Sequence, residues 1–379
     1  MRKELSNKIC IDRSVVIKKG ISLLGALAAF IILLLPRPAS AIDLGFAHLY
    51  GYIDLEYKQT TSDKFESSGP DDANLKNGSF DLHHLNFLLD ATVSPNLFVK
   101  VQMEFEHGIN SLAAESTVVL EYGFMEYLVD DWMKFRAGKM LSPWGIYNEI
   151  YDATPAYLTV FPPDVFYRAD RKGGFMLMPK WTTGLAALGV SAINSDYDEL
   201  DYILYVGNGE SRVIINDSEN DDNINKAVGG RVLYKSHDEK YQFGASGYYG
   251  DKAVSRSRLE ETHWTAAFQA ELNWQSFNFH SEYGYSVLGK QKETAFYLQG
   301  SYRYERYTPY LRYEAIDPDL DQNLDNWNIY LAGLNVKLTD YMFFKVEWNQ
   351  HVREVNNEDI IIGEAQNYGE FRTAIAVLF

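Results

Sequence analysis

Apolar and polar residues alternate along most of this 379-residue chain. Residues 45–58 set the pattern. Apolar or small side chains such as Leu49 and Leu55 occupy every second position, and polar side chains such as Glu56 lie between them. Because successive side chains of a β-strand point to opposite faces, a period of two predicts strands with one apolar and one polar face. The pattern predicts sixteen strands, at 45–58, 80–93, 97–107, 117–129, 132–139, 184–193, 200–206, 227–236, 241–250, 262–273, 277–287, 294–304, 308–315, 327–338, 342–353 and 368–379.

The connections between these strands also alternate. Seven are short turns, and the eight others are mostly longer and richer in Asp, Asn, Gly and Ser. Short turns at one end and longer loops at the other are typical of the up-and-down barrels of outer membranes. A soluble sandwich shows the same alternation of side chains, but its connections are less regular. We therefore expect an all-β fold, a transmembrane antiparallel up-and-down β-barrel of about 16 strands. The pattern is weak around residues 171–200, which leaves fourteen or eighteen strands as alternatives.

The final strand is apolar on one side and polar or small on the other. Phe371, Ile375 and Phe379 share the first side, and Glu370 and Arg372 share the second. A barrel must pair its last strand with its first, because an open edge cannot sit in hydrocarbon. The ending resembles the C-terminal signature of bacterial outer-membrane barrels, in which the final Phe helps to recruit the barrel assembly machinery. The resemblance implies that Phe379 is an assembly signal, and the strand alone leaves the edge of a secreted sandwich as the alternative.

The first residues have the layout of a targeting segment. A basic region is followed by an apolar run at 21–35 and by small residues at 39–41. This layout predicts a secretory signal peptide at 1–41, cleaved to leave a barrel domain at 42–379. A retained membrane anchor is the competing interpretation, but the apolar run is shorter than the ~20 residues that a helical span needs. The single cysteine, Cys10, lies in the removed segment, so disulfides and thiolate chemistry are excluded from the mature chain.

Charge and composition narrow the function classes. The chain carries 35 Lys and Arg against 52 Asp and Glu, a net charge of −17, and removal of the seven basic and two acidic residues of segment 1–41 leaves 28 against 50, or −22. Such a chain lacks the positive face that a phosphate backbone needs, so nucleic acid is not expected as a partner. Tyr (27), Phe (21) and Trp (7) recur near the ends of the alternating runs, as in the aromatic girdles of membrane barrels. The expected surroundings are outer-membrane lipid and lipopolysaccharide.

The longest segment without alternation extends from Leu141 to about Thr183, and it contains five prolines and several aromatic residues. A loop of this length inside a compact fold needs a reason. Because a sixteen-stranded barrel has a lumen wide enough for water, a loop that folds inward would narrow it. The alternative is an outward loop without a selective role. The charges expected at such a constriction, where they would set selectivity, are Asp164, Arg168, Asp170, Arg171 and Lys172.

The polar faces of the predicted strands carry charges of both signs. Opposed rows of acidic and basic side chains would create a transverse field and set an ion preference. The alternative is that many of them pair across strands and stabilise the wall. The charged residues expected on the lumen wall are Glu104, Glu106, Arg136, Arg231, Glu282, Arg303, Arg312, Glu314, Lys345, Glu347 and Arg372.

Catalytic motifs are absent from the sequence. The chain has no Gly-x-Ser-x-Gly elbow, no His-Glu-x-x-His motif and no phosphate-binding glycine loop, so we do not expect an enzyme. His280 and His351 would be the candidates if the barrel were an outer-membrane hydrolase. His83 and His84 are adjacent, and adjacent residues of a continuous strand point to opposite faces. We therefore expect neither a metal site nor a cofactor.

One acidic run could still attract a cation. Asp317, Asp319 and Asp321 are spaced by single residues in a predicted outward connection. The run would either bind a divalent cation that bridges to lipopolysaccharide or remain an ordinary solvated loop. It lacks the glycine and the distal Glu of a calcium-binding hand, which favours the solvated loop.

Several segments resemble one family of membrane channels. Residues 135–139, followed by Ser142-Pro143-Trp144-Gly145, are similar to a segment of phosphate-selective and related porins. Further segments fall in the same order as in that family, at 207–209, 228–232, 243–249 and 309–314. The resemblance implies a sixteen-stranded, homotrimeric diffusion channel of a Gram-negative outer membrane. Where relatives often carry paired Arg in the second strand, this chain has His83 and His84, so the resemblance indicates architecture and not phosphate as the cargo.

Together these features predict a porin that allows passive diffusion of small hydrophilic solutes or ions through a water-filled barrel, with selectivity set by lumen and loop charges. Three alternatives remain open. One is a barrel that sheathes a partner protein, such as an electron carrier or an export component. The second is an outer-membrane barrel enzyme, and the third is a soluble secreted β-sandwich that binds sugars.

Overall fold

The computed structural model describes residues 42–43, 45–61, 77–106, 118–130, 132–167, 177–194, 197–210, 225–253, 260–322, 325–354 and 367–379. They belong to one compact unit that extends from Ser40 to Phe379. Among the described residues, no helix is both long and apolar enough to cross a membrane. Outside the described part lie the predicted signal peptide at 1–41, the side chain of Glu106 and four of the predicted constriction charges, Arg168, Asp170, Arg171 and Lys172.

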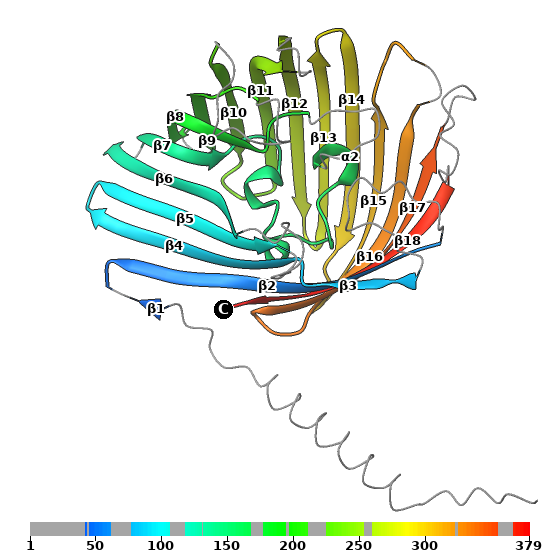
Figure 1. The fold of residues 1–379 in the computed structure, drawn as a ribbon. Coiled ribbons are helices and arrows are strands. Elements are labelled where there is room, and N and C mark those ends of the chain that lie inside the picture. The colour runs from blue at the N-terminus through cyan, green and yellow to red at the C-terminus, as the bar shows by residue number, and fades with distance from the viewer. Residues whose placement is uncertain are drawn as a thin grey trace, which may run out of the picture. The chain divides into compact units, whose positions relative to one another are not determined.

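In the described part of the chain, sixteen strands of nine or more residues form one antiparallel sheet that closes on itself (Figure 1). Long strands pair with their neighbours in chain order, and two short strands, β1 (Ile42–Asp43) and β3 (Ser79–Asp81), pair with the first long one. The predicted closed barrel of sixteen strands is confirmed. The long strands are β2 (Ala47–Thr60), β4 (His84–Ser94), β5 (Leu97–Glu106), β6 (Val118–Asp130), β7 (Met133–Leu141), β8 (Trp181–Ala192), β9 (Glu199–Gly207), β10 (Ala227–Lys235), β11 (Tyr241–Ala253), β12 (Glu260–Trp274), β13 (Phe277–Leu288), β14 (Gln291–Tyr302), β15 (Tyr307–Asp317), β16 (Trp327–Lys337), β17 (Met342–Arg353) and β18 (Asn367–Leu378).

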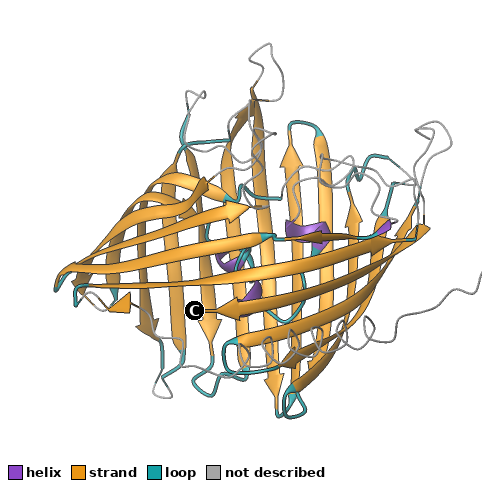
Figure 2. Ribbon diagram, turned by 60° about the horizontal axis from the view of Figure 1, so that its bottom comes forward, coloured by secondary structure: helices purple, strands orange, loops and turns teal. Residues whose placement is uncertain are grey.

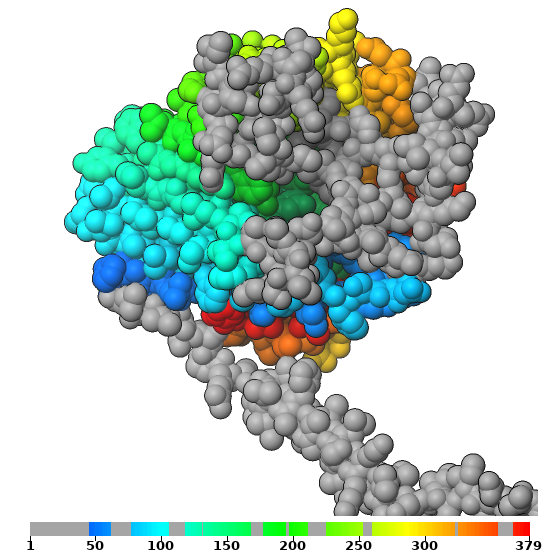
Figure 3. Space-filling model, viewed as in Figure 1, coloured from blue at the N-terminus to red at the C-terminus, as the bar shows by residue number. Residues whose placement is uncertain are grey.

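The barrel closes where the last strand meets the first. β18 pairs with β2 along nine residue pairs, which end at Leu378 opposite Tyr52. Beyond them, the backbone N–H and C=O of Phe379 each bond to Gly51 at 2.9 Å. A Cβ atom at Gly51 would clash with the backbone oxygen of Asn86 and lie 2.8 Å from the Phe379 ring, so this close approach requires glycine. In the space-filling view, the red atoms of the last strands meet the blue atoms of the first (Figure 3).

The alternation of the sequence separates an outer from an inner surface. On the outside, large apolar side chains such as Phe268 (57% exposed) and Leu311 (67% exposed) face away from the barrel. Polar residues at the alternate positions, such as Asp54, Glu282 and Arg372, are almost completely buried. Backbone groups pair between strands, so only the outer side chains need to be apolar in hydrocarbon. The outer surface therefore has the character of a lipid-facing band.

One predicted strand is interrupted. The expected strand at 80–93 is divided into β3 and β4, and Leu82 and His83 lie between them, outside the ladder with β2. The period of two fails at this place. The imidazole rings of His83 and His84 stack face to face, with centroids 3.9 Å apart and planes 11° apart. The prediction that the two rings point to opposite faces is wrong, because it assumed a continuous strand.

In the connection between β7 and β8, the described residues 142–167 and 177–180 lie inside the ring of strands, and the helical segments among them appear in the interior in Figure 2. We call this connection, residues 142–180, the inner loop. Its boundaries are close to the predicted segment 141–183, because β7 ends at Leu141 and β8 begins at Trp181. Its described residues contain three short helical segments, η3 (Asn148–Ile150), η4 (Thr154–Ala156) and α2 (Asp164–Tyr167).

Candidate functional site

The inner loop brings an apolar cluster of its own into the lumen. Trp144 stacks on Tyr167 with ring centroids 4.7 Å apart, and Phe166 packs edge-on against Tyr297 of β14 at 5.9 Å. All four side chains are almost completely buried. Aromatic side chains bury large areas, which offsets the entropy that a long loop loses on becoming ordered. The inner loop is thus a packed element of the barrel interior rather than a surface loop.

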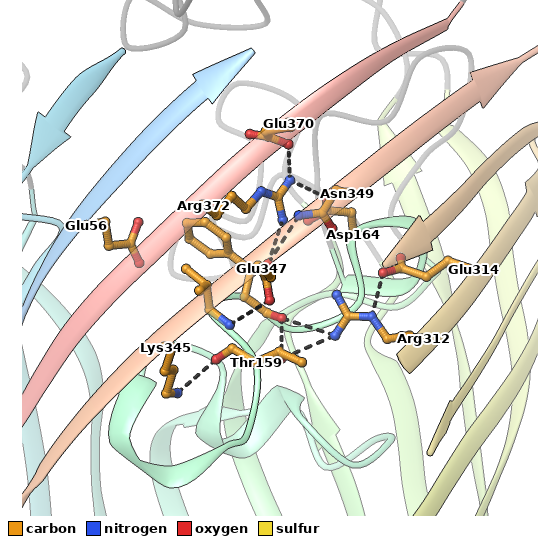
Figure 4. A network of polar contacts seen from close by, with 12 residues as sticks. Glu56, Thr159, Asp164, Arg312, Glu314, Lys345, Glu347, Asn349, Glu370 and Arg372 are labelled. Atoms are coloured by element: carbon orange, nitrogen blue, oxygen red, sulfur yellow. Dashed lines mark hydrogen bonds and ion pairs between the residues drawn. The ribbon is translucent and has the colours of Figure 1, made fainter. Parts of the chain in front are cut away.

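Lys345 of β17 holds the first half of the inner loop. Its buried ammonium group donates hydrogen bonds to three backbone carbonyl oxygens, those of Thr154, Tyr157 and Thr159. The last two bonds are 2.6 and 2.8 Å long, and Figure 4 shows the contact with Thr159. An ammonium group has three donors, and all three are used here. Lys345 therefore fixes the backbone of residues 154–159.

Two carboxylates bind backbone amides of the same loop. Glu347 of β17 accepts a hydrogen bond from the N–H of Val160 at 3.1 Å, and Glu314 of β15 accepts one from the N–H of Val165 at 3.0 Å. Arg312 donates from Nε to Glu314 at 2.7 Å. Buried charges are costly unless they have such partners. The charged side chains of this wall are therefore bonded to the main chain of the inner loop.

Arg372 of β18 binds the carboxylate that begins α2 (Figure 4). Its Nη2 lies 2.6 Å from Oδ2 of Asp164 and 2.6 Å from Oε2 of Glu370, and its Nη1 lies 3.7 Å from Oε1 of Glu347. Asp164 is the one predicted constriction charge that lies among the described residues. It is buried against the wall, where Arg372 balances its charge.

Glu282 of β13 is a shared acceptor for two parts of the inner loop. It accepts hydrogen bonds from the hydroxyl of Tyr167 at 2.7 Å, from the N–H of Ile146 at 2.8 Å, and from the hydroxyl of Tyr297 on the wall at 2.7 Å. Burial and the Glu282 carboxylate raise the pKa of Tyr167 well above its usual value. The phenol therefore stays protonated and remains a donor.

The structure gives the predicted lumen-wall residues different surroundings. Arg231 pairs with Glu149 of the inner loop at 2.7 Å, and Arg136 pairs with Glu126 of β6 at 2.8 Å. Arg303 is exposed in the turn between β14 and β15. The period of two located these residues, but nothing in it indicated that several of them hold the inner loop. The predicted lumen-wall residues that are almost completely buried are Glu104, Glu282, Arg312, Glu314, Lys345, Glu347 and Arg372.

A second group of charges lies where the inner loop meets β2, β4 and β5. Nδ1 of His84 is 3.0 Å from Oδ2 of Asp54. Nε2 of the same ring is 3.6 Å from Oε1 of Glu104 and 3.8 Å from Oδ1 of Asp152, which belongs to the inner loop. Lys180 binds Asp152 at 2.6 Å. Burial lowers the pKa of Lys180, but the nearby carboxylates, Asp152 first, outweigh burial and raise it overall, so the side chain stays charged.

No role was predicted for Asp54, Glu121, Asp152 or Lys180. Asp54 lies on β2 at a position that the period of two assigns to the polar face, whereas Glu121 lies at a register shift between β5 and β6, where the period of two fails. Asp152 and Lys180 lie in the inner loop, where no periodicity shows which residues point toward the wall. His280 and His351, the candidates for a hydrolase, are engaged with Glu271 and Glu370 at 3.2 Å in each pair.

A cavity of about 800 Å³ lies between the inner loop and the turn ends of strands from β10 to β15. The Lys240 ammonium and the Ser236 hydroxyl lower the pKa of Asp238 to about 2, so that this carboxylate is ionised at neutral pH. The charged residues around the cavity are Asp238, Glu239, Lys240, Glu271 and Arg303, with His280 beside them.

A family model for Gram-negative porins matches residues 26–342, which is most of the chain. The chain belongs to the Gram-negative porin family. It is a passive diffusion channel of the outer membrane of a Gram-negative bacterium, and the prediction of that function and location is confirmed. The match supports porin architecture and does not extend to phosphate selectivity.

Solved structures share the fold of this porin. The outer membrane channel DcaP of Acinetobacter baumannii has a TM-score of 0.60 at 10% identity, over 91% of this chain and 99% of its own. An anion-selective porin from Comamonas acidovorans has a TM-score of 0.62 at 11% identity, over 88% and 99%. The trimer form of OmpT from Vibrio cholerae has a TM-score of 0.53 at 11% identity, over 88% and 99%. No curated protein matches the chain.

Proposed function

We propose that this porin passes small hydrophilic solutes and ions through a lumen that the inner loop narrows. One observation carries the proposal. The main chain of the inner loop is bonded to buried charges of the wall, through the carbonyls that Lys345 binds and through the amides of Val160 and Val165. A loop held in this way keeps a fixed position in the lumen, as a constriction must.

We infer a mild cation preference from the charges that are left free of the inner loop. Around the cavity at the turn ends, three carboxylates face two basic side chains, those of Lys240 and Arg303. The predicted constriction charges Arg168, Asp170, Arg171 and Lys172 remain part of the proposal as residues that contribute to selectivity. Phosphate is not the proposed cargo, because His83 and His84 are engaged with Glu56 and Asp54 where an anion site would need free donors.

The reversal potential in a planar bilayer under a salt gradient tests this proposal. We expect discrete current steps and a small potential of the sign that marks cation preference. Glu271→Gln should move the potential toward anions, and Arg303→Gln should move it toward cations, because each removes one charge beside the cavity. Charge reversal at Arg168, Arg171 and Lys172 should also shift it. If the potential is unchanged in Glu271→Gln, in Arg303→Gln and in the charge-reversal variant, these residues do not contribute to selectivity.

We also propose that the porin is a homotrimer and that Phe379 is read by the barrel assembly machinery. The trimer form of OmpT, which shares the fold, supports the first point, and the place of Phe379 at the closing seam supports the second. Deletion of Phe379 should lower the amount of folded barrel in outer membranes several-fold, as read from heat-modifiable migration on gels. Light scattering in detergent gives the oligomer mass. An unchanged folded fraction would show that assembly of the barrel does not depend on Phe379.

A further inference from the structure

The inner wall is short of positive charge where β4, β5 and β6 meet the inner loop. Glu104, Glu121 and Asp152 all lie near Lys180, and each of these carboxylates is buried. Lys180 contacts Asp152 at 2.6 Å and Glu121 at 3.4 Å. Three buried carboxylates beside one ammonium group are unfavourable unless a further cation or protons balance them. Oε1 of Glu104 accepts a hydrogen bond from Asn86 at 2.9 Å, whereas its buried Oε2 has no hydrogen-bond donor among the described residues.

His84 has the orientation of a metal ligand. Its Nδ1 is 3.0 Å from Oδ2 of Asp54, and its backbone N–H donates to Oδ1 of the same carboxylate at 2.8 Å. A carboxylate at Nδ1 favours the tautomer with the proton on Nδ1, which leaves the lone pair on Nε2. Metal-binding histidines almost always carry such a partner on the second ring nitrogen. Asp54 therefore directs Nε2 toward Glu104 and Asp152.

The distances around Nε2 fit a metal ion better than direct hydrogen bonds. Nε2 is 3.6 Å from Oε1 of Glu104 and 3.8 Å from Oδ1 of Asp152, and the three atoms all lie within 4.8 Å of one another. Separations above 3.5 Å are too long for hydrogen bonds. Ligand atoms at bonds of 2.0–2.1 Å in a tetrahedral site are roughly 3.3 Å apart, so the three atoms need only a small inward movement.

We propose that His84, Glu104 and Asp152 bind a divalent transition-metal ion of the Zn²⁺ class. One imidazole and two carboxylates suit Zn²⁺ or a similar ion, whereas Mg²⁺ and Ca²⁺ take oxygen ligands alone. His84 and Glu104 belong to the wall, and Asp152 belongs to the inner loop. The ion thus cross-links the loop to β4 and β5, and it adds to the hydrogen bonds from β15, β17 and β18.

Two other groups of titratable side chains in the described part of the chain fit an ion less well. In the set of Glu56, His83 and His84, the Nδ1 of His83 is already bonded to Glu56 at 2.8 Å, and Nδ1 of His84 is bonded to Asp54. In the set of Asp164, His351 and Glu370, the Arg372 guanidinium supplies the positive charge. The site at Nε2 of His84 is the one that leaves ligand atoms without hydrogen bonds between them.

Zinc binding to the full-length porin in detergent tests the proposal, after treatment with a chelator and dialysis. Isothermal titration with Zn²⁺ should show one tight site per chain that excess Mg²⁺ does not displace. Glu104→Gln and Asp152→Asn each remove one ligand charge with little change in volume, and each should weaken binding at least tenfold. Asp54→Asn should weaken it by roughly 10–100-fold, because Asp54 orients the ligand. X-ray absorption should show one imidazole and oxygen ligands.

His83→Gln is the matched control, since it removes the stacked neighbour and leaves all three proposed ligands in place. It should bind Zn²⁺ like the unmodified porin. Loss of binding in this control, equal binding in the Glu104→Gln and Asp152→Asn variants, or the absence of a tight site would each overturn the proposal. Heat-modifiable migration confirms that each variant is a folded barrel. Because the titration records no current, its outcome is independent of the test of ion conduction.

Discussion

The inner loop meets two walls of different chemistry. On the side of β15, β17 and β18, acidic and basic side chains alternate, and Arg312, Lys345 and Arg372 each lie beside a carboxylate or a carbonyl. On the side of β4, β5 and β6, carboxylates predominate, and Lys180 of the loop is the near ammonium group. The first wall holds the loop with its own charges. The second wall places the carboxylates of Glu104, Glu121 and Asp152 around Lys180, with the imidazole of His84 beside two of them.

The largest expected effect comes from the first wall. Arg372→Met would leave the carboxylates of Asp164 and Glu370 buried without their guanidinium partner. Loss of one member of a buried ion pair costs about 3–5 kcal/mol, so we expect the free energy of unfolding in detergent to fall by that amount. Urea titration followed by tryptophan fluorescence measures it. Arg303→Met is the matched control because Arg303 is exposed, and its effect should stay within about 0.5 kcal/mol. Equal losses in both variants would contradict the comparison.

A smaller effect is expected at Lys345. Lys345→Met keeps the length of the side chain but leaves three loop carbonyls without a donor. We expect a net loss of about 1–3 kcal/mol in unfolding free energy, because the cost of the unsatisfied carbonyls is partly offset by removal of a buried charge. The loop should also become less firmly held, which predicts a larger and noisier single-channel current. Lys337→Met, at an exposed pair with Asp340, should change neither quantity.

The smallest effect is expected on the second wall in metal-free protein. Asp152→Asn removes one of three carboxylates around Lys180. Lys180 loses one ion pair, but the repulsion between the Asp152 carboxylate and the other two carboxylates is also removed. We expect a smaller loss than at Arg372, because Glu121 remains 3.4 Å from Lys180 and keeps it paired. Addition of Zn²⁺ at 100 times the dissociation constant of the unmodified porin should stabilise that porin by about 2.7 kcal/mol and the variant by about 1.4 kcal/mol or less, because the variant binds at least tenfold more weakly. A large loss without metal would show that this wall is as well balanced as the first.

The fold was predictable because its cause acts on every residue of a strand. Lipid on one side and polar contacts on the other impose a period of two, and the sixteen predicted strands correspond to the observed ones within a few residues. The prediction that the barrel closes came from the final strand, which is apolar on one face and polar or small on the other. The prediction was wrong at His83 and His84, since a two-residue break in the ladder puts both rings side by side and no pattern in the sequence marks that break.

The candidate site was predictable only in part. Polar positions such as Glu314, Lys345 and Glu347 were assigned to the inner surface from the alternation alone. Their partners are backbone groups of a loop more than a hundred residues away in the chain, as in the bond from Val165 to Glu314. A backbone amide has no sequence signature, so these contacts were not visible. The same holds for Asp152, whose position beside His84 depends on the path of the inner loop.

The wall on the side of β15 and β17 binds main-chain atoms of the inner loop. Lys345, Glu347 and Glu314 bind carbonyls and amides that any amino acid other than proline would offer at the same places. Side chains that make none of these contacts and line the cavity, such as those of Ala156 and Leu158, can therefore be exchanged while the backbone contacts are kept. In a barrel built in this way, the side chains that line the pore can be substituted, in evolution or by design, without loss of the contacts that hold the loop.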